Sequence, residues 1–222
     1  MPYMTDSVIP GALPQSRLYQ EAFAVHGDSS AAVLWPRGRQ ALRFKALTQH
    51  FSGAGFSVLD FGCGLAHLKD DLDQRFADYR YIGADVVPEF VQAVRDKHPT
   101  ATVHLIRNYA ELVEPVDHVV VSGTFNLVDG DSSAEYLAYV QGALQHLFGI
   151  CRVSLAVNFM TDRVDFMQPG AHHVNVESMY RFMCDRLSPR LRIDQSYMPY
   201  EFTMVAFRNS GIVRPDNIYE PV

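Results

Sequence analysis

The feature that most constrains the fold is an alternation, between residues 57 and 160, of short apolar runs with longer amphipathic segments. The apolar runs are rich in β-branched residues and predict five strands, at 57–61, 79–86, 102–107, 118–123 and 151–160. The segments between them predict helices, over 65–76, 88–98 and 131–149. Because such alternation builds parallel sheets through right-handed crossovers, we expect a doubly wound α/β fold whose strands are covered on both faces.

The C-terminal part of the chain departs from this alternation. A helix predicted at 176–187 is followed by two strand-like runs, 191–198 and 201–208. Only Pro199 and Tyr200 separate the two runs, which is too short a gap for a parallel crossover. We therefore expect an antiparallel hairpin at this end of the sheet.

The N-terminal part is predicted to be helical. Segments 14–26 and 37–51 carry apolar residues at helical spacing and precede the first strand. The sequence thus predicts one compact domain with a mostly parallel, seven-stranded sheet. In this organisation residues 1–54 form a helical cap or lid and residues 55–222 form the ligand-binding part.

Composition limits the compartment and the partners. The chain has 222 residues and a formal net charge of -6, with no basic cluster, which disfavours nucleic acid as a partner. Three widely spaced cysteines without a CxxC pair fit a reduced protein and no zinc site, so the cytoplasm is expected and no metal is. Neither a secretory signal nor a membrane-spanning run is recognisable.

The most informative motif is the stretch SVLDFGCGLA at 57–66, where a buried strand runs into a glycine turn. A dinucleotide fingerprint would place a third glycine at position 67, which is His67, and no GK[ST] follows as a phosphate-binding P-loop requires. A phosphate would also be repelled by Asp60, two residues before the turn. The turn therefore favours a ligand without phosphate.

S-adenosylmethionine fits this turn because it is cationic at its sulfonium and ammonium groups. Asp60 would complement that charge, and Gly62 and Gly64 allow the backbone to approach the ligand closely. Asp85, at the end of the second predicted strand, is placed to accept hydrogen bonds from the ribose hydroxyls of a nucleoside. That acidic position would serve a nicotinamide cofactor equally well.

The sequence here resembles the class I S-adenosylmethionine-dependent methyltransferases. VLDFGCGLA is similar to their first motif, IGADV to their acidic second-strand motif, and the closing hairpin to their last two strands. The resemblance covers about residues 55–208. It departs from the usual pattern at Ala66, where a third glycine is common, and we expect only a minor adjustment there.

The resemblance implies which residues bind the cofactor. Asp60 and the backbone of Gly62, Cys63 and Gly64 would hold the methionine portion, and Asp85 the ribose with Val86 beside the adenine. The adenine-facing polar position corresponds to Asn108 and Tyr109, which alternatively belong to an ordinary turn. Cys63 is equally read as a small buried filler without reactivity.

Ser122 to Asn126, SGTFN, match the family's loop where the transferable methyl meets its acceptor, which makes Ser122 and Gly123 further cofactor contacts. Several other segments, HGDSSAAVLW and AVNFMTDRVDF among them, resemble a subgroup of small bacterial methyltransferases, some of surface-sugar or natural-product pathways. That subgroup implies that Trp35 and Arg43 close over the cofactor, with Arg43 pairing with its carboxylate. Core packing for Trp35 and a solvated position for Arg43 are the alternatives.

Three residues are candidates for contact with the acceptor or removal of its proton: Asn126, His173 and Glu201. Asn126 alternatively caps a turn, the His172-His173 pair alternatively enters a helix, and Glu201 is alternatively a hairpin charge. The function predicted is methyl transfer by in-line displacement to a small-molecule oxygen or nitrogen, a sugar or natural-product intermediate. A non-catalytic nucleoside-binding scaffold and, less favoured, a nicotinamide oxidoreductase remain alternatives. Oligomeric state is left open.

Overall fold

The computed structural model describes residues 12–34, 39–128 and 134–208. Its strands are β1 Phe56–Phe61, β2 Tyr79–Asp85, β3 Thr102–Leu105, β4 Val116–Val121, β5 Cys151–Thr161, β6 His173–Val174, β7 Leu191–Asp194 and β8 Glu201–Phe207. Its helices are α1 Ala12–His26, α2 Gln40–Thr48, α3 His67–Asp73, α4 Pro88–Lys97, the short 3-10 helix η1 Tyr109–Glu111, α5 Ala134–Ile150 and α6 Val176–Arg186.

The strands form one sheet in the order β3-β2-β1-β4-β5-β8-β7. The first five of these strands run parallel, and β8 is antiparallel to both β5 and β7. The strand order reverses between β1 and β4, and ligands bind in open α/β sheets outside the carboxyl ends of strands at such a switch point. The predicted doubly wound fold and its C-terminal antiparallel hairpin are confirmed.

The sheet has one strand more than predicted. His173 and Val174 form the short strand β6, which pairs parallel with the end of β5 at Met160 and Thr161. From the sequence, His172 and His173 are expected in a loop, because a strand of two residues is too short to show the alternation of apolar and polar residues. Only the partner strand, 12 or more residues earlier in the chain, makes this segment extended.

Two further expectations were wrong in detail. β3 is not covered on both faces: only Val103 of its four residues is buried, because β3 lies at the edge of the sheet. The hairpin connection is longer than two residues, since β7 already ends at Asp194. The carboxylate of Asp194 accepts hydrogen bonds from the N–H and the hydroxyl of Ser196, which turns the chain away from the sheet.

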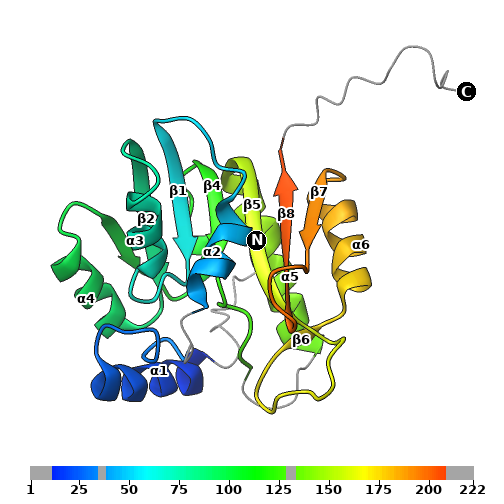
Figure 1. Ribbon diagram of the computed structural model, residues 1–222, viewed down its shortest axis with the longest axis horizontal. Coiled ribbons are helices and arrows are strands. Elements are labelled where there is room, and N and C mark those ends of the chain that lie inside the picture. The colour runs from blue at the N-terminus through cyan, green and yellow to red at the C-terminus, as the bar shows by residue number, and fades with distance from the viewer. Residues whose placement is uncertain (1–11, 35–38, 129–133, 209–222) are drawn as a thin grey trace, which may run out of the picture.

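Helices cover both faces of the sheet (Figure 1). On one face α5 and α6 pack against strand residues that include Leu59, Val119 and Leu155. On the other face α2, α3 and α4 pack against the alternate residues, Val58 and Val120 among them. The β-branched strand residues are thus buried on both sides, which is the physical reason for their continuous apolar runs.

The N-terminal helix α1 lies beyond the end of the sheet to which the β1 arrow points (Figure 1). Tyr19 and Phe23 of α1 make edge-to-face contacts with Phe90 of α4, at ring-centroid distances of 5.9 and 5.6 Å. The following loop is held by Asp28, which pairs with His67 and Lys97. These contacts fix α1 over the carboxyl ends of the strands.

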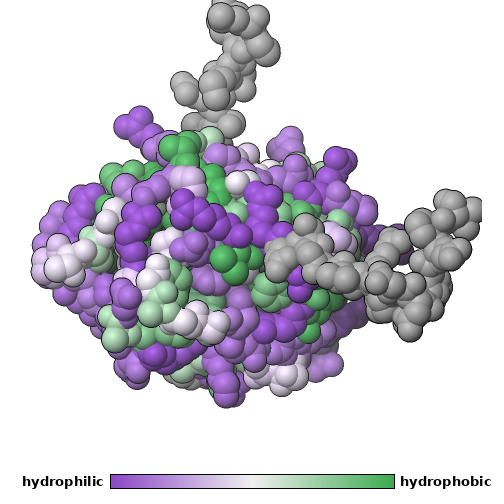
Figure 2. All heavy atoms as spheres, turned by 90° about the horizontal axis from the view of Figure 1, so that it is seen from above, coloured by the Kyte–Doolittle hydropathy of each residue, from purple (hydrophilic) through white to green (hydrophobic). Residues whose placement is uncertain are grey.

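The surface seen in Figure 2, at the opposite end of the sheet, is mostly hydrophilic with separate apolar areas. Scattered apolar surface of this kind is normal for a folded chain. In the described part of the chain, none of the helices is long and apolar enough to cross a membrane.

Candidate functional site

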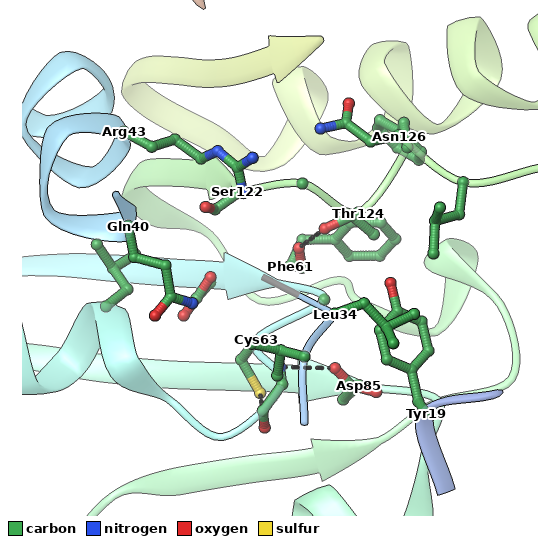
Figure 3. Close-up of a pocket in the computed structure, with 18 of the residues that line it drawn as sticks. Tyr19, Leu34, Gln40, Arg43, Phe61, Cys63, Asp85, Ser122, Thr124 and Asn126 are labelled. Atoms are coloured by element: carbon green, nitrogen blue, oxygen red, sulfur yellow. Dashed lines mark hydrogen bonds between the residues drawn. The ribbon is translucent and has the colours of Figure 1, made fainter. Parts of the chain in front are cut away.

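A cavity of about 530 Å³ opens at the carboxyl ends of β1, β2 and β4. This size lies in the range of small-molecule and cofactor sites. Eleven of the fourteen predicted site residues line it: Arg43, Asp60, Gly62, Cys63, Gly64, Asp85, Val86, Ser122, Gly123, Asn126 and Glu201. Figure 3 shows Asp85 and Cys63 on one side of the cavity and Arg43, Ser122 and Asn126 on the other.

The glycine turn after β1 has a backbone that other residues adopt only with strain. Gly62 and Gly64 have φ angles of +74° and +54°, in the left-handed region. A Cβ on Gly62 would overlap the side chain of Thr124, whose hydroxyl donates a 2.8 Å hydrogen bond to the Phe61 carbonyl. The turn is thus packed tightly against the loop that follows β4.

Ala66, where the family pattern often has glycine, also has a positive φ of +57°. A non-glycine residue in this region costs about 1–2 kcal/mol. Ala66 nevertheless serves as the residue that caps the start of α3, since its carbonyl accepts the N–H of Lys69 at 2.9 Å. The substitution of alanine for glycine at this position therefore leaves the turn in place and costs backbone strain.

Asp60 is an almost fully buried carboxylate, 2% exposed. Tyr81 on β2 donates a 2.7 Å hydrogen bond to its Oδ2. The pKa of Asp60 is raised to about 7, chiefly by burial; the bond from Tyr81 acts in the lowering direction and the neighbouring Asp85 charge in the raising direction. Such a carboxylate gains from a cationic ligand, which would offset its desolvation.

The Asp85 carboxylate fixes the backbone of two segments at the cavity, the glycine turn after β1 and the residues that follow β2. Its Oδ2 accepts the N–H of Gly64 at 2.8 Å and its Oδ1 accepts the N–H of Val87 at 2.9 Å. Burial raises its pKa, while these backbone hydrogen bonds act in the opposite direction. The carboxylate that faces the ligand therefore also fixes the glycine turn.

Cys63 lies between these two carboxylates. The side chain is buried, and burial together with the charges of Asp85 and Asp60 raises the pKa of its thiol well above the ordinary value. A neutral thiol is a poor nucleophile. The geometry supports the interpretation of Cys63 as a small apolar filler.

Arg43 and Glu201 form a buried ion pair across the cavity from Asp85. Arg43 donates from Nε to Glu201 Oε2 at 3.0 Å, and its Nη2 donates to Oε1. Asn158 donates a further hydrogen bond to Oε2 at 3.0 Å. The alternatives of a solvated Arg43 and an exposed hairpin charge at Glu201 are wrong, since the two residues are 4% and 3% exposed.

Asn126 is buried in the cavity wall with an unsatisfied amide. It is 7% exposed, and its Oδ1 has no hydrogen-bond partner. Its backbone is fixed, because its N–H donates to the Gly123 carbonyl at 3.1 Å and its carbonyl accepts the N–H of His172 at 2.8 Å. A buried polar atom without a partner costs about 1–3 kcal/mol, which a ligand group hydrogen-bonded to it would recover.

Three further predicted site residues, Asn108, Tyr109 and His173, are not among the residues that line the cavity. Asn108 caps η1 by accepting the N–H of Ala110, and the Tyr109 ring packs against Tyr139, a residue that does line it. The ring nitrogens of His173 contact the Thr161 carbonyl and the N–H of Gln168, at 2.7 and 3.1 Å. Trp35 lies outside the described residues.

Several cavity residues were not predicted from the sequence: Tyr19, Leu34, Gln40, Tyr139, Gln168, Met198 and Tyr200. Most come from helices and loops far apart in the sequence, and no local pattern marks them. Tyr81 was also missed, although strand alternation could have found it. Asp60 pairs with Gly83 in the β1–β2 register, so Tyr81 lies on the same face two residues earlier.

Metal ligation finds no support in the described residues. No group of three or more His, Cys, Asp or Glu side chains among them is arranged to hold a metal ion. The charged groups of the cavity wall are accounted for largely by Asp60, Asp85 and the Arg43–Glu201 pair. Asp60 and Asp85 give this wall buried carboxylate oxygens, which can accept hydrogen bonds from an organic ligand and offset positive charge on it.

Comparison with curated proteins finds a mycobacterial relative. A Mycobacterium tuberculosis protein named "Putative methyltransferase Rv1506c" is 27% identical over 157 residues, which cover 70% of this chain and 95% of that protein. No family model matches the chain.

Solved structures that are similar to this chain include methyltransferases. Magnesium protoporphyrin IX methyltransferase from Synechocystis PCC 6803, with bound S-adenosylhomocysteine, has a TM-score of 0.64 at 16% identity, covering 89% of this chain and 95% of that one. Geranyl diphosphate C-methyltransferase from Streptomyces coelicolor A3(2), also with S-adenosylhomocysteine, has a TM-score of 0.61 at 12% identity, covering 90% and 98%. The chain has the Rossmann-like fold of the class I S-adenosylmethionine-dependent methyltransferases.

Proposed function

We propose that this protein is an S-adenosylmethionine-dependent methyltransferase that acts on a small-molecule acceptor. The fold, the name of its mycobacterial relative and the cofactor bound in similar structures support the reaction class. The cavity at the switch point of the sheet supports the position of the site.

The observation that carries the proposal is the pair of buried carboxylates around the glycine turn. Asp60 and Asp85 are 2% and 7% exposed, and both line the cavity. Two buried negative groups oppose a pyrophosphate and favour a ligand with cationic and hydroxyl groups. The residues present therefore fit S-adenosylmethionine and do not favour a nicotinamide dinucleotide.

The cofactor would supply a methyl group on a sulfonium that acts as an electrophile. In our proposal Asp60 balances the cationic methionine end, while the backbone of Gly62 to Gly64 lies against it without Cβ atoms in the way. Asp85 accepts the ribose hydroxyls and Val86 lies beside the adenine. The part played by the protein is mainly to bind, orient and exclude water.

The acceptor is proposed to bind on the Asn126 side of the cavity. The unsatisfied Oδ1 of Asn126 suits an acceptor whose reacting oxygen or nitrogen carries a hydrogen. Met160, Met198 and Tyr200 add apolar wall, which fits a partly apolar molecule, such as a modified sugar or natural-product intermediate, more than nucleic acid. His173 and Glu201 are not retained as bases, since His173 lies outside the cavity wall and Glu201 is paired.

Isothermal titration calorimetry tests the cofactor assignment. The full chain should bind S-adenosylmethionine and S-adenosylhomocysteine and should not bind NADH. The assignment fails if neither sulfur compound gives a heat of binding, and tight NADH binding would favour the oxidoreductase. Binding without methyl transfer to a panel of amines, phenols and sugar hydroxyls would support the non-catalytic scaffold.

A further inference from the structure

The Arg43–Glu201 ion pair is the start of a hydrogen-bonded chain that ends at the loop after β4. Its two side chains are 5% and 3% exposed, and the fork-like contact satisfies both carboxylate oxygens. A buried ion pair rarely adds stability over apolar residues of the same size, because desolvation offsets the attraction. Its place in the cavity wall therefore calls for a role other than stability.

The chain continues through Asn158 on β5, which is 1% exposed. The Nδ2 of Asn158 donates to Glu201 Oε2 at 3.0 Å, while its Oδ1 accepts the N–H of Gly123 at 2.7 Å. Because a carboxylate only accepts, the amide of Asn158 has one orientation that satisfies both neighbours. The negative charge on Glu201 thus determines that an acceptor faces Gly123.

The loop 122–126 is held between this chain and the glycine turn. Gly123 has a φ of +77°, and a Cβ there would lie 2.8 Å from Nη1 of Arg43. The Gly123 carbonyl accepts the N–H of Asn126 at 3.1 Å. On the other side Thr124 bonds to the Phe61 carbonyl and covers Gly62.

We propose that Arg43, Glu201 and Asn158 are positioning residues for methyl transfer, which fix loop 122–126 so that Asn126 and the cofactor turn keep a constant separation. This inference rests on the proposed function of the cavity. Ion-paired Arg43 is then a support for the loop, and Glu201 orients Asn158 without accepting a proton from the substrate. In-line transfer depends on such fixed separation, since small displacements of reacting groups lower rates strongly.

The decisive variant replaces the pair by neutral residues of similar length, Arg43→Met with Glu201→Met. A purely structural pair would tolerate this exchange, because apolar replacement of a buried ion pair is often neutral or stabilising. A positioning role predicts an unchanged urea midpoint together with a faster-exchanging Gly123 amide by NMR. It also predicts about tenfold weaker S-adenosylhomocysteine binding by calorimetry, since Thr124 no longer packs firmly on the turn.

A second variant guards against a folding defect in the first. Asn158→Ala keeps both members of the ion pair and removes the two hydrogen bonds of Asn158, to Glu201 and from Gly123, so it should give the same changes in exchange and affinity. The matched control is Arg80→Met with Glu114→Met, an exposed ion pair with both side chains 52% exposed, which should change neither.

The outcomes separate this inference from the function it rests on. If the unchanged protein fails to bind S-adenosylhomocysteine, the proposed function fails, while Gly123 exchange still reports on the network. If the unchanged protein binds and both network variants keep its affinity and its Gly123 protection, the positioning role is overturned and the methyltransferase assignment stands.

Discussion

Tyr81 donates a 2.7 Å hydrogen bond to Asp60 between neighbouring strands, in a region where both side chains are buried. The bond stabilises the ionised carboxylate, but burial dominates and leaves the pKa of Asp60 raised to about 7. The Asp60 carboxylate, which we propose contacts the cofactor, is therefore ionised in only part of the molecules near neutral pH. Binding, stability and pH are linked through this one group.

Cofactor binding should weaken as the pH falls through 7. The sulfonium of S-adenosylmethionine keeps its charge at every pH, while Asp60 takes up a proton as the pH falls through this range. If only the ionised form binds well, affinity at pH 6 should be about tenfold lower than at pH 8. Calorimetry across this range measures it, and a pH-independent affinity would exclude Asp60 as the counter-charge.

Two variants assign that pH dependence to the Tyr81–Asp60 contact. Asp60→Asn should weaken binding at pH 8 and abolish the pH dependence. Tyr81→Phe removes a hydrogen bond that lowers the Asp60 pKa, so the midpoint should move to higher pH. Tyr79→Phe is the control, because that phenol donates to Asp73 on α3.

The same Asp60→Asn change should stabilise the ligand-free protein. The folded pKa of about 7 lies above the value near 3.9 of an unfolded aspartate, so the folded state binds the extra proton between them. The free energy of unfolding therefore falls as pH rises from about 4 to 7, and Asn removes this loss. We expect a gain on the order of 2 kcal/mol at pH 8 in urea unfolding, and a loss there would contradict the argument.

Asp85→Ala should weaken S-adenosylhomocysteine binding by on the order of 1–3 kcal/mol. Two effects contribute, since the carboxylate is the proposed ribose ligand and it also accepts the N–H groups of Gly64 and Val87. Calorimetry gives the affinity, and Asp96→Ala on the exposed side of α4 is the control. Unchanged affinity would place the ribose elsewhere.

Gly62→Ala should destabilise the protein by about 3 kcal/mol, from the left-handed backbone and the overlap with Thr124 together. Gly27→Ala separates the two causes, because Gly27 has a φ of +58° and open space where its Cβ would lie. That variant should cost about 1 kcal/mol in urea unfolding. Equal costs at both positions would show that the packing against Thr124 does not matter.

A pair of histidines away from the cavity, of which His118 is buried and His50 is partly buried, predicts acid sensitivity. His50 Nε2 and His118 Nδ1 both contact the hydroxyl of Ser154, at 2.7 and 2.8 Å. Burial lowers the pKa of His50 to about 3 and that of His118 to about 4. Below pH 6.5 the unfolded chain takes up protons that the folded chain does not, so the free energy of unfolding should fall as the pH falls, by about 2 kcal/mol for each histidine by pH 5.

Replacing these histidines by neutral amides of matching geometry tests the claim. His50→Gln with His118→Asn keeps a polar group near Ser154 and should flatten the dependence of unfolding free energy on pH between 7 and 5. His104→Asn, on the exposed edge strand β3, should leave the slope as it was. An unchanged slope in the double variant would assign acid sensitivity to other groups.

The sequence alone was sufficient for the parallel sheet, its closing hairpin and the part of the cavity wall around the glycine turn. These features depend on local patterns: β-branched runs, two glycines in left-handed backbone, and acidic residues at two strand ends. Asp60, Gly62, Gly64 and Asp85 follow directly from strand ends that a parallel sheet brings to one edge. Chain order and alternation already contain that information.

Only the tertiary structure decided what lies on the acceptor side. Arg43 has the same local pattern whether it is solvated or buried, and its partner Glu201 is 158 residues away in the chain. The neighbours of Asn158 and of the short strand at His173 likewise come from segments far apart in the sequence, which meet only when the sheet forms. Which side chains pair across such distances depends on tertiary packing, and the local sequence pattern does not predict it.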